Sequence, residues 1–287
     1  MLIKFIYIIL LLYNYCHKKT RESIIFKGEG FMSKGFLTPG ETAQATISAG
    51  IKKANISTQN AILLGLFGGA FIGFGALGSM IVSQTFGKID PGVASFLSAM
   101  VFPVGLMLVV VAGAELFTGN TLMAIALMDK KITLGKMLRN WGLVYFANLV
   151  GSILLVALVF YSSTLTGDAA TKAIAVAEAK VNSTIASMFL KAILCNILVV
   201  LAVWMATASQ DIMSKLASCW TVIMLFVLCG FQHSVANMFF IPMGMALGAN
   251  ITMVQFITNL VFVTLGNIVG GSIVVGGIYY LCYVKNS

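Results

Sequence analysis

The stretch Gly230-Phe231-Gln232-His233-Ser234-Val235-Ala236-Asn237 separates two apolar runs that are each too short to cross a bilayer. The runs cover residues 217–229 and 235–247, and each has 13 residues, whereas a crossing helix needs about 20. Together they predict one membrane span with a polar break in its middle. An imidazole at that depth is costly unless it faces a cavity or a partner, so we expect His233 to be functional.

A second stretch, Gly113-Ala114-Glu115-Leu116-Phe117-Thr118-Gly119-Asn120, interrupts the apolar run 93–128 in a similar way. As one unbroken helix that run would be roughly 54 Å long, well beyond the hydrocarbon thickness. The break at 230–237 repeats the break at 113–120, from Gly to Asn, 117 positions later, with Gln232 at the place of Glu115. Downstream, Asn140 and Asn148-Leu149-Val150-Gly151 recur 119 positions later as Asn259 and Asn267-Ile268-Val269-Gly270. The chain is therefore interpreted as two copies of one unit.

Composition indicates an integral membrane protein, with 59% hydrophobic and 9% charged residues against about 25% charged in a soluble domain. The runs are continuous and do not alternate, which excludes a β-barrel. We predict an all-α membrane protein with six transmembrane helices in two inverted three-helix repeats, the second and fifth helices broken. The apolar segments lie at 61–83, 93–128, 137–163, 184–207, 217–247 and 253–284.

The net charge of +9 is explained better by membrane orientation than by nucleic-acid binding. If both termini are cytoplasmic, most basic residues fall in inner connections, as the positive-inside bias requires. We therefore expect the lipid bilayer as a partner and no nucleic acid. The inner basic residues would be Lys34, Lys52, Lys53, Lys130, Lys131, Lys136, Arg139, Lys215 and Lys285.

Five segments divide the chain. We expect residues 1–31 to be an upstream translated extension or a non-native leader, with Met32 as the native start. Residues 32–60 would form a cytoplasmic N-terminal helix, capped by Thr38 before Pro39. The first three-helix repeat would cover 61–163, an outer loop 164–183, and the second repeat 184–287. On composition alone, Lys180 reads as a solvated lysine of that loop.

Enzymatic and metal chemistry find little support. The five cysteines are scattered without a CxxC pattern, so we expect inert thiols and no metal site. There is no HExxH or GxSxG motif, and Glu115 is the only acid inside a predicted span. We expect no enzyme activity and no cofactor.

Around the two breaks, the sequence resembles the formate/nitrite transporter family, whose members include channels for formate, nitrite and hydrosulfide. The resemblance covers roughly residues 36–284 and rests on a series of motifs in order. They are Ala114-Glu115-Leu116-Phe117-Thr118, Asn140-Trp141, Tyr145 to Gly151, Ala202-Val203-Trp204-Met205, Gly230 to Met243, and Gly266 to Gly271.

The resemblance implies an aquaporin-like protomer in a homopentamer, each protomer with its own pore, in the bacterial cytoplasmic membrane. It implies a basic outer vestibule at Lys180 and a central His233 paired with Thr118. It also implies polar pore positions at Asn196 and Asn267. The implied constriction side chains are Phe102 and Phe226 toward the outside, and Leu106, Leu116 and Phe117 toward the centre and inside. Gln232 departs from the acid that the formate channel has beside its histidine.

A bare anion pays a large dehydration cost in an apolar slit, whereas a neutral acid does not. The function expected is thus a channel or transporter for small monovalent weak-acid anions such as hydrosulfide, nitrite or formate. Gln232 and the compact residues around the breaks slightly favour a very small ion such as hydrosulfide or nitrite. The alternatives are an ion-coupled secondary transporter and a neutral-solute channel of aquaporin type. Taken singly, His233 could be a satisfied structural histidine, and Phe102, Leu106 and Phe226 plain lipid- or core-facing residues.

Overall fold

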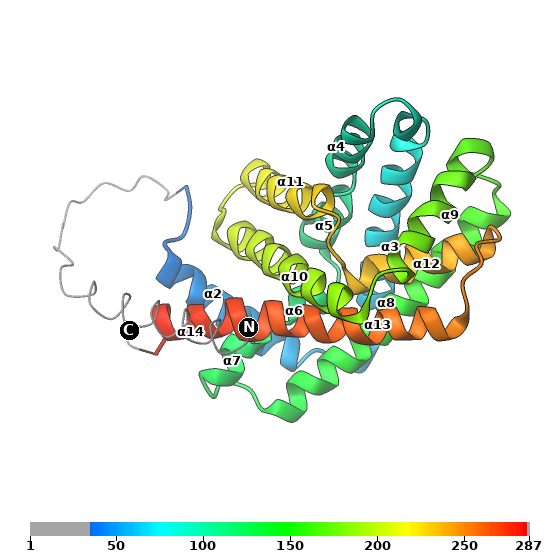
Figure 1. Cartoon of the computed structure of the whole chain (residues 1–287). Coiled ribbons are helices and arrows are strands. Elements are labelled where there is room, and N and C mark those ends of the chain that lie inside the picture. The colour runs from blue at the N-terminus through cyan, green and yellow to red at the C-terminus, as the bar shows by residue number, and fades with distance from the viewer. Residues whose placement is uncertain (1–34, 286–287) are drawn as a thin grey trace. The chain divides into compact units, whose positions relative to one another are not determined.

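The structure is a computed structural model that describes residues 35–285. The leader 1–31 and the start at Met32 lie outside the described residues. Residues Gly35 onward form one unit, in which helix follows helix (Figure 1). In chain order these are α2 (Pro39–Ala54), α3 (Thr58–Ser83), η1 (Phe86–Lys88), α4 (Pro91–Val101), α5 (Val104–Met107), η2 (Leu108–Gly113), α6 (Phe117–Asn120), α7 (Met123–Met128), α8 (Leu134–Tyr161), α9 (Gly167–Val181), α10 (Ile185–Ala208), α11 (Ile212–Leu228), α12 (Ser234–Ala246), α13 (Met253–Ile268), η3 (Val269–Gly276) and α14 (Gly277–Tyr283).

Within residues 35–285, five helices are long and apolar enough to cross a membrane: Thr58–Ser83, Pro91–Gly113, Leu134–Tyr161, Ile185–Ala208 and Met253–Tyr283. Three shorter apolar helices are Phe117–Met128, Ile212–Leu228 and Ser234–Ala246. Both predicted breaks are present as interruptions of helix. One lies between η2 and α6, and the other between α11 and α12.

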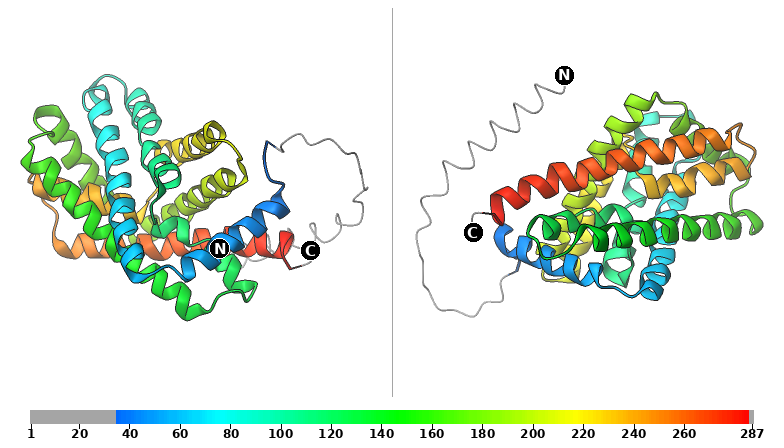
Figure 2. Two further views of the ribbon diagram at one scale, coloured as in Figure 1. Left: turned by 180° about the vertical axis from the view of Figure 1, so that it is seen from behind. Right: turned by 90° about the horizontal axis from the view of Figure 1, so that it is seen from below.

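Two pairs of long helices pack backbone to backbone: α3 against α8, and α10 against α13 (Figure 2). A Cβ on Gly151 of α8 would collide with the carbonyl oxygen of Leu66, and one on Gly266 of α13 would collide with that of Phe189. Close approach of this kind is the usual role of glycine between membrane helices. The glycines of the first span therefore serve contacts within the chain, as in the case of Gly69 against Asn148.

The predicted outer loop 164–183 is wrong in one respect, because most of it is the 15-residue helix α9. Its alanine-rich sequence favours a helix, and Asp168 and Lys180 lie in the first and last turns, where their charges suit the helix dipole. One face is buried through Ala169, Ala173, Ala177 and Val181, and α9 packs against α12, α3 and α13. Lys180 is thus held on a packed helix and is not a solvated loop lysine.

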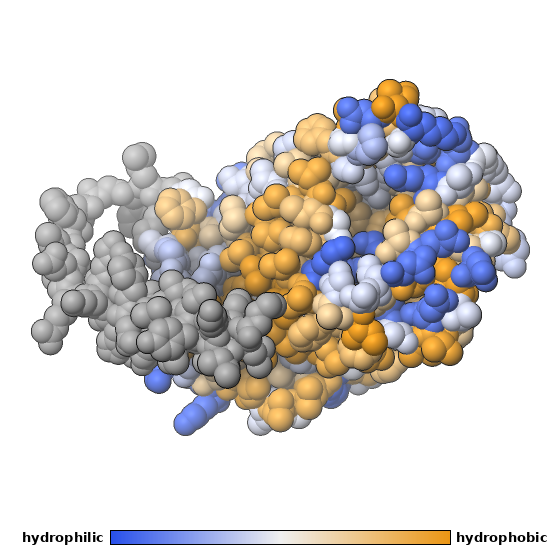
Figure 3. Space-filling view, viewed as in Figure 1, coloured by the Kyte–Doolittle hydropathy of each residue, from blue (hydrophilic) through white to orange (hydrophobic). Residues whose placement is uncertain are grey.

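Hydrophobic side chains gather over the sides of the long helices, and hydrophilic ones near the ends of α4 and α9 (Figure 3). Large apolar residues are exposed on α3, α8 and α13, among them Phe67, Leu158 and Val254. Such a surface suits lipid or another subunit.

Candidate functional site

The two breaks place the starts of α6 and α12 next to each other. Thr118 Oγ1 lies 2.9 Å from Nε2 of His233, and both residues are buried. Each break is preceded by a glycine in the left-handed region, Gly113 with φ +88° and Gly230 with φ +66°. Glycine adopts this conformation without a Cβ penalty, so the chain can turn sharply before each short helix begins.

The second ring nitrogen of His233 determines its tautomer. Nδ1 accepts the backbone N–H of Ala236 at 3.0 Å, which makes His233 the N-cap of α12. A nitrogen that accepts a hydrogen bond carries no proton, so the proton of the neutral ring is on Nε2. The Nε2–H group then donates to Thr118, and the hydroxyl hydrogen of Thr118 remains for another acceptor.

Each short helix is held at its start by an asparagine from a long helix. Asn148 Oδ1 accepts the N–H of Phe117 at 3.0 Å, and Asn267 Oδ1 accepts the N–H of Ser234 at 2.9 Å. The amide groups of the two asparagines donate to backbone carbonyls on both sides: Asn148 to Gly65 and Glu115, Asn267 to Ala192 and Gln232. The same hydrogen-bonding scheme therefore occurs twice.

A second pair of buried networks follows the same plan. Asn120 donates to Glu115 at 2.6 Å and to Asn140 at 2.9 Å. Asn237 donates to Gln232 and to Asn259, both at 2.8 Å. Residues at matching positions of the sequence therefore make matching hydrogen bonds.

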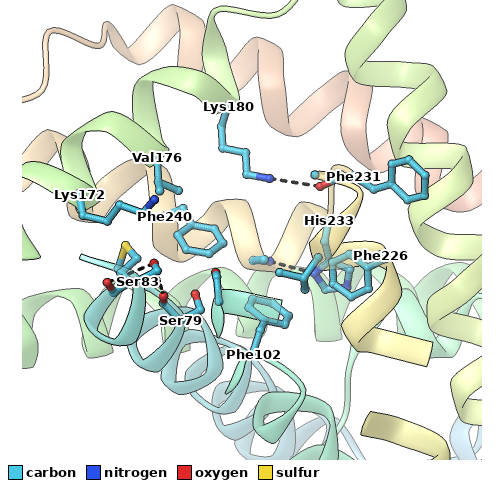
Figure 4. A pocket seen from close by; sticks show the side chains of 15 residues that line it. Ser79, Ser83, Phe102, Lys172, Val176, Lys180, Phe226, Phe231, His233 and Phe240 are labelled. Carbon is cyan, nitrogen blue, oxygen red and sulfur yellow. Dashed lines mark hydrogen bonds between the residues drawn. The ribbon is translucent and has the colours of Figure 1, made fainter. Parts of the chain in front are cut away.

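A cavity of about 130 Å³ opens on one side of His233 (Figure 4). Lys172, Val176 and Lys180 point into it from successive turns of one face of α9. Further lining residues are Ser79, Met80, Ser83, Ser98, Phe102, Phe226, Val227, Gly230, Phe231, His233, Ala236 and Phe240. The cavity combines two basic side chains and three hydroxyls with an aromatic floor.

That floor consists of three phenylalanine rings beside the histidine, which lines the same cavity. The ring centroids of Phe102 and Phe226 are 5.5 Å apart in an edge-to-face arrangement, and Phe240 stacks on Phe102 at 6.2 Å. Phe226 in turn stacks on His233 at 5.9 Å. Phe102 and Phe226, for which the resemblance implies a constriction, line both this cavity and a smaller space beside it.

Lys180 lies above this floor. Its Nζ donates to the carbonyl of Phe231 at 3.2 Å and lies 5.8 Å from the centroid of the Phe240 ring. Burial lowers the pKa of the Lys180 ammonium to about 8, and the charge of Lys191 acts in the same direction. At neutral pH the ammonium is therefore mostly protonated, but it loses its proton at a lower pH than the ammonium of a surface lysine does.

On the far side of the phenylalanines, a space of about 10 Å³ has room for roughly one water molecule. His233 is the polar residue of its lining, and the remaining side chains are Ile72, Phe102, Leu106, Leu116, Val199, Ile223 and Phe226. A charged solute here would find almost no polar partner except the histidine pair.

The structure separates the candidate residues into three groups. His233, Phe102, Phe226, Leu106, Leu116 and Lys180 line one or both cavities, and Thr118 contacts His233. Phe117 lines neither cavity, because its ring packs against Trp141 and Tyr145. Asn196 and Asn267 also line neither. Asn196 donates to backbone carbonyls of Thr118 and Asn267 and to the Thr121 hydroxyl, so both asparagines brace the breaks.

Sequence reasoning missed Phe240 and Lys172 as cavity residues and Lys53 as the partner of Glu115. The spacing of Lys172, Val176 and Lys180 at every fourth position was a usable sign, had this segment been predicted as a helix. Phe240 carries no such sign, because every residue around it is apolar.

Comparison with known proteins agrees with this arrangement. A family model described as "Formate/nitrite transporter" matches residues 40–281. The chain is 43% identical over 254 residues to "Uncharacterized transporter YrhG" of Bacillus subtilis, covering 87% of this chain and 95% of that protein. It is 40% identical over 273 residues to a "Probable formate transporter" of Methanothermobacter thermautotrophicus, covering 88% and 100%. A solved "Pentameric formate channel with formate bound" superposes with a TM-score of 0.71 at 34% identity, covering 82% and 99%.

Proposed function

The chain belongs to the formate/nitrite transporter family, a family of multi-pass membrane transporters, and from this premise we propose that it conducts small monovalent weak-acid anions. The observation that carries the proposal is the contact of Thr118 with His233 beside a small apolar space. We assign one apolar gate to Phe102, Phe226 and Phe240, and a second gate to Leu106 and Leu116.

The path begins in the basic cavity. Lys172 and Lys180 raise the local concentration of anions there, and the effect is focused by the apolar walls. The aromatic floor then excludes water, so a charged solute would lose its hydration without compensation. A weak-acid anion avoids this cost when it takes up a proton at the floor.

In this proposal the proton comes from water in the cavity and not from an imidazolium, and the hydroxide that remains returns to the outer solution. A protonated Nδ1 would face the N–H of Ala236, donor against donor, and the cap of α12 would be lost. His233 instead stays neutral and offers hydrogen bonds together with Thr118. The solute is held briefly between the gates and ionises again beyond Leu106 and Leu116.

Formate is the first substrate to test, because one relative and the solved structure above are named for it. Hydrosulfide and nitrite share its single charge, small size and weak-acid character, and they belong to the same proposal.

The proposed architecture has six membrane passes, two of them broken, in two inverted repeats. The repeated hydrogen bonds of Asn148 and Asn267 support it. We propose a homopentamer, as the name of the solved formate channel states for that protein. We also propose that it lies in the bacterial cytoplasmic membrane, with both termini cytoplasmic.

The test is a competition series of formate, nitrite, hydrosulfide, acetate and lactate in proteoliposomes, with wild type beside His233→Asn. Asparagine still caps a helix but lacks the imidazole, so formate flux and its pH profile should both change. An unchanged flux and profile would remove the histidine from the mechanism. Uptake that strictly requires a sodium gradient would instead support a secondary transporter, and water flux without anion flux a neutral-solute channel.

A further inference from the structure

Two lysines occupy matching places at opposite ends of α3. Lys53 lies just before α3 begins, whereas Lys180 faces the cavity that Ser79 and Ser83 line at the end of α3. A helix of 26 residues spans about 39 Å. The carbonyl of Lys53 accepts the amide of Asn140 at 3.0 Å, and that of Lys180 accepts Asn259 at 2.8 Å.

The residue opposite each lysine differs. Opposite Lys53 is Glu115, which accepts Asn120 with one oxygen and the ammonium of Lys53 with the other, at 2.6 Å. Opposite Lys180 is Gln232, which accepts Asn237 with its oxygen. Its nitrogen donates to the Lys180 carbonyl at 3.3 Å. An amide cannot neutralise an ammonium.

The charges at the two ends are consequently unequal. Lys53 and Glu115 form an ion pair whose side chains are only 29% and 9% exposed. In the part of the chain that the structure describes, no carboxylate lies within 4.0 Å of the Lys180 ammonium. That ammonium is left with the carbonyl of Phe231 and the ring of Phe240.

We propose that the Glu115 and Gln232 pair sets the direction in which the path prefers to load anions. Gln232 leaves Lys180 uncompensated, so that end binds anions. Glu115 cancels Lys53, so the other end binds them weakly. This inference rests on the proposed function, because it concerns the two entrances of the same path.

Isosteric exchanges test this. Gln232→Glu adds a carboxylate next to Lys180 as a counter-ion, although it gives up the amide's hydrogen bond to the Lys180 carbonyl. Glu115→Gln removes the counter-ion of Lys53. Both exchanges keep the side-chain size and the bond to asparagine. Formate flux is measured in right-side-out and inverted membrane vesicles, which present opposite entrances. In wild type, the half-saturating formate concentration should be lower at the Lys180 entrance.

Gln232→Glu should raise the half-saturating formate concentration at the Lys180 entrance about tenfold, which corresponds to about 1.4 kcal/mol. The half-saturating concentrations at the two entrances should then be equal. Glu115→Gln should lower the half-saturating concentration at the Lys53 entrance, and the double exchange should reverse the preference. Assembly of each variant is checked by size-exclusion chromatography, and Gln232→Glu alone decides the matter if Glu115→Gln does not fold.

An unchanged value at the Lys180 entrance in Gln232→Glu would overturn the inference, and so would equal values at both entrances of wild type. Absence of anion flux from wild type in both vesicle types is a different result, because it contradicts the proposed function itself. If Gln232→Glu also fails to assemble, Lys180→Gln is used instead. It removes the positive charge that Gln232→Glu would have neutralised, so it must abolish the difference between the entrances.

Discussion

Thr118 and His233 are 115 positions apart in the chain, yet their side chains meet at 2.9 Å. Each stands at the start of a short helix that begins inside an apolar run. Because Ala236 fixes the ring proton on Nε2, Thr118 is the acceptor of this bond and can donate its own hydrogen to a solute. In the proposed path, this contact is the polar stop between the two apolar gates.

Replacing Thr118 with valine keeps the shape and removes the hydroxyl. The buried Nε2–H of His233 then has no partner, which costs about 1–3 kcal/mol, and a solute loses its donor. We expect a lower unfolding temperature and about tenfold lower formate flux, as for about 1.4 kcal/mol of lost interaction. Thr118→Ser keeps the hydroxyl and should retain most of the flux. Equal fluxes from the valine and serine variants would show that the hydroxyl is not used.

Anion loading should fall as the pH rises through about 8. Burial lowers the pKa of Lys180 to that value, so the side chain is charged below it and neutral above it. Arginine stays charged throughout. The ratio of wild-type to Lys180→Arg formate flux should therefore decrease between pH 7 and pH 9. A constant ratio would argue that Lys180 does not attract the anion through its charge.

Salt provides an independent check on Lys180. Attraction by a vestibule charge is screened by salt over a Debye length of about 10 Å at 0.1 M. Lys180→Ala should therefore reduce formate uptake most at low ionic strength. An equal reduction at every salt concentration would indicate a structural lysine.

The aromatic floor should select by size. Phe102→Ala removes the ring that contacts both Phe226 and Phe240, and we expect lactate flux to increase relative to formate flux. The cost in stability is about 3–5 kcal/mol for a buried phenylalanine. Phe96→Ala is the matched control, since Phe96 is on α4 but 46% exposed. A lactate to formate ratio that stays at the wild-type value would contradict a gate at Phe102.

The asparagine braces should matter for folding rather than for selectivity. Asn267→Leu leaves the N–H of Ser234 and the carbonyl of Gln232 without their partner in a buried site, and it removes a second donor from the helical carbonyl of Ala192. Each lost partner costs about 1–3 kcal/mol, so the variant protein should melt well below wild type. Asn250→Leu is the matched control, because Asn250 is exposed. Normal thermal stability of Asn267→Leu would refute the bracing role.

The repeated Gly-to-Asn breaks and the apolar run lengths were sufficient to predict interrupted helices. They follow from local physics, since a run of 13 apolar residues cannot cross a bilayer and glycine permits the turn. The sequence does not indicate the helix in segment 164–183, because its alanines are neither strongly apolar nor polar. Only packing against α12 gives them a buried face.

The sequence by itself determined the membrane class, the two breaks and the matching of Glu115 with Gln232, because these depend on residue type and spacing. Only the tertiary structure decided which side chains meet across the breaks. It showed that Asn196, Asn267 and Phe117 line neither cavity, and it added Phe240 and Lys172 as cavity residues. The pairing of Lys53 with Glu115 also came from the tertiary structure alone. Hydrogen bonds and ion pairs between distant helices depend on how the helices pack, and spacing along the chain does not specify that packing.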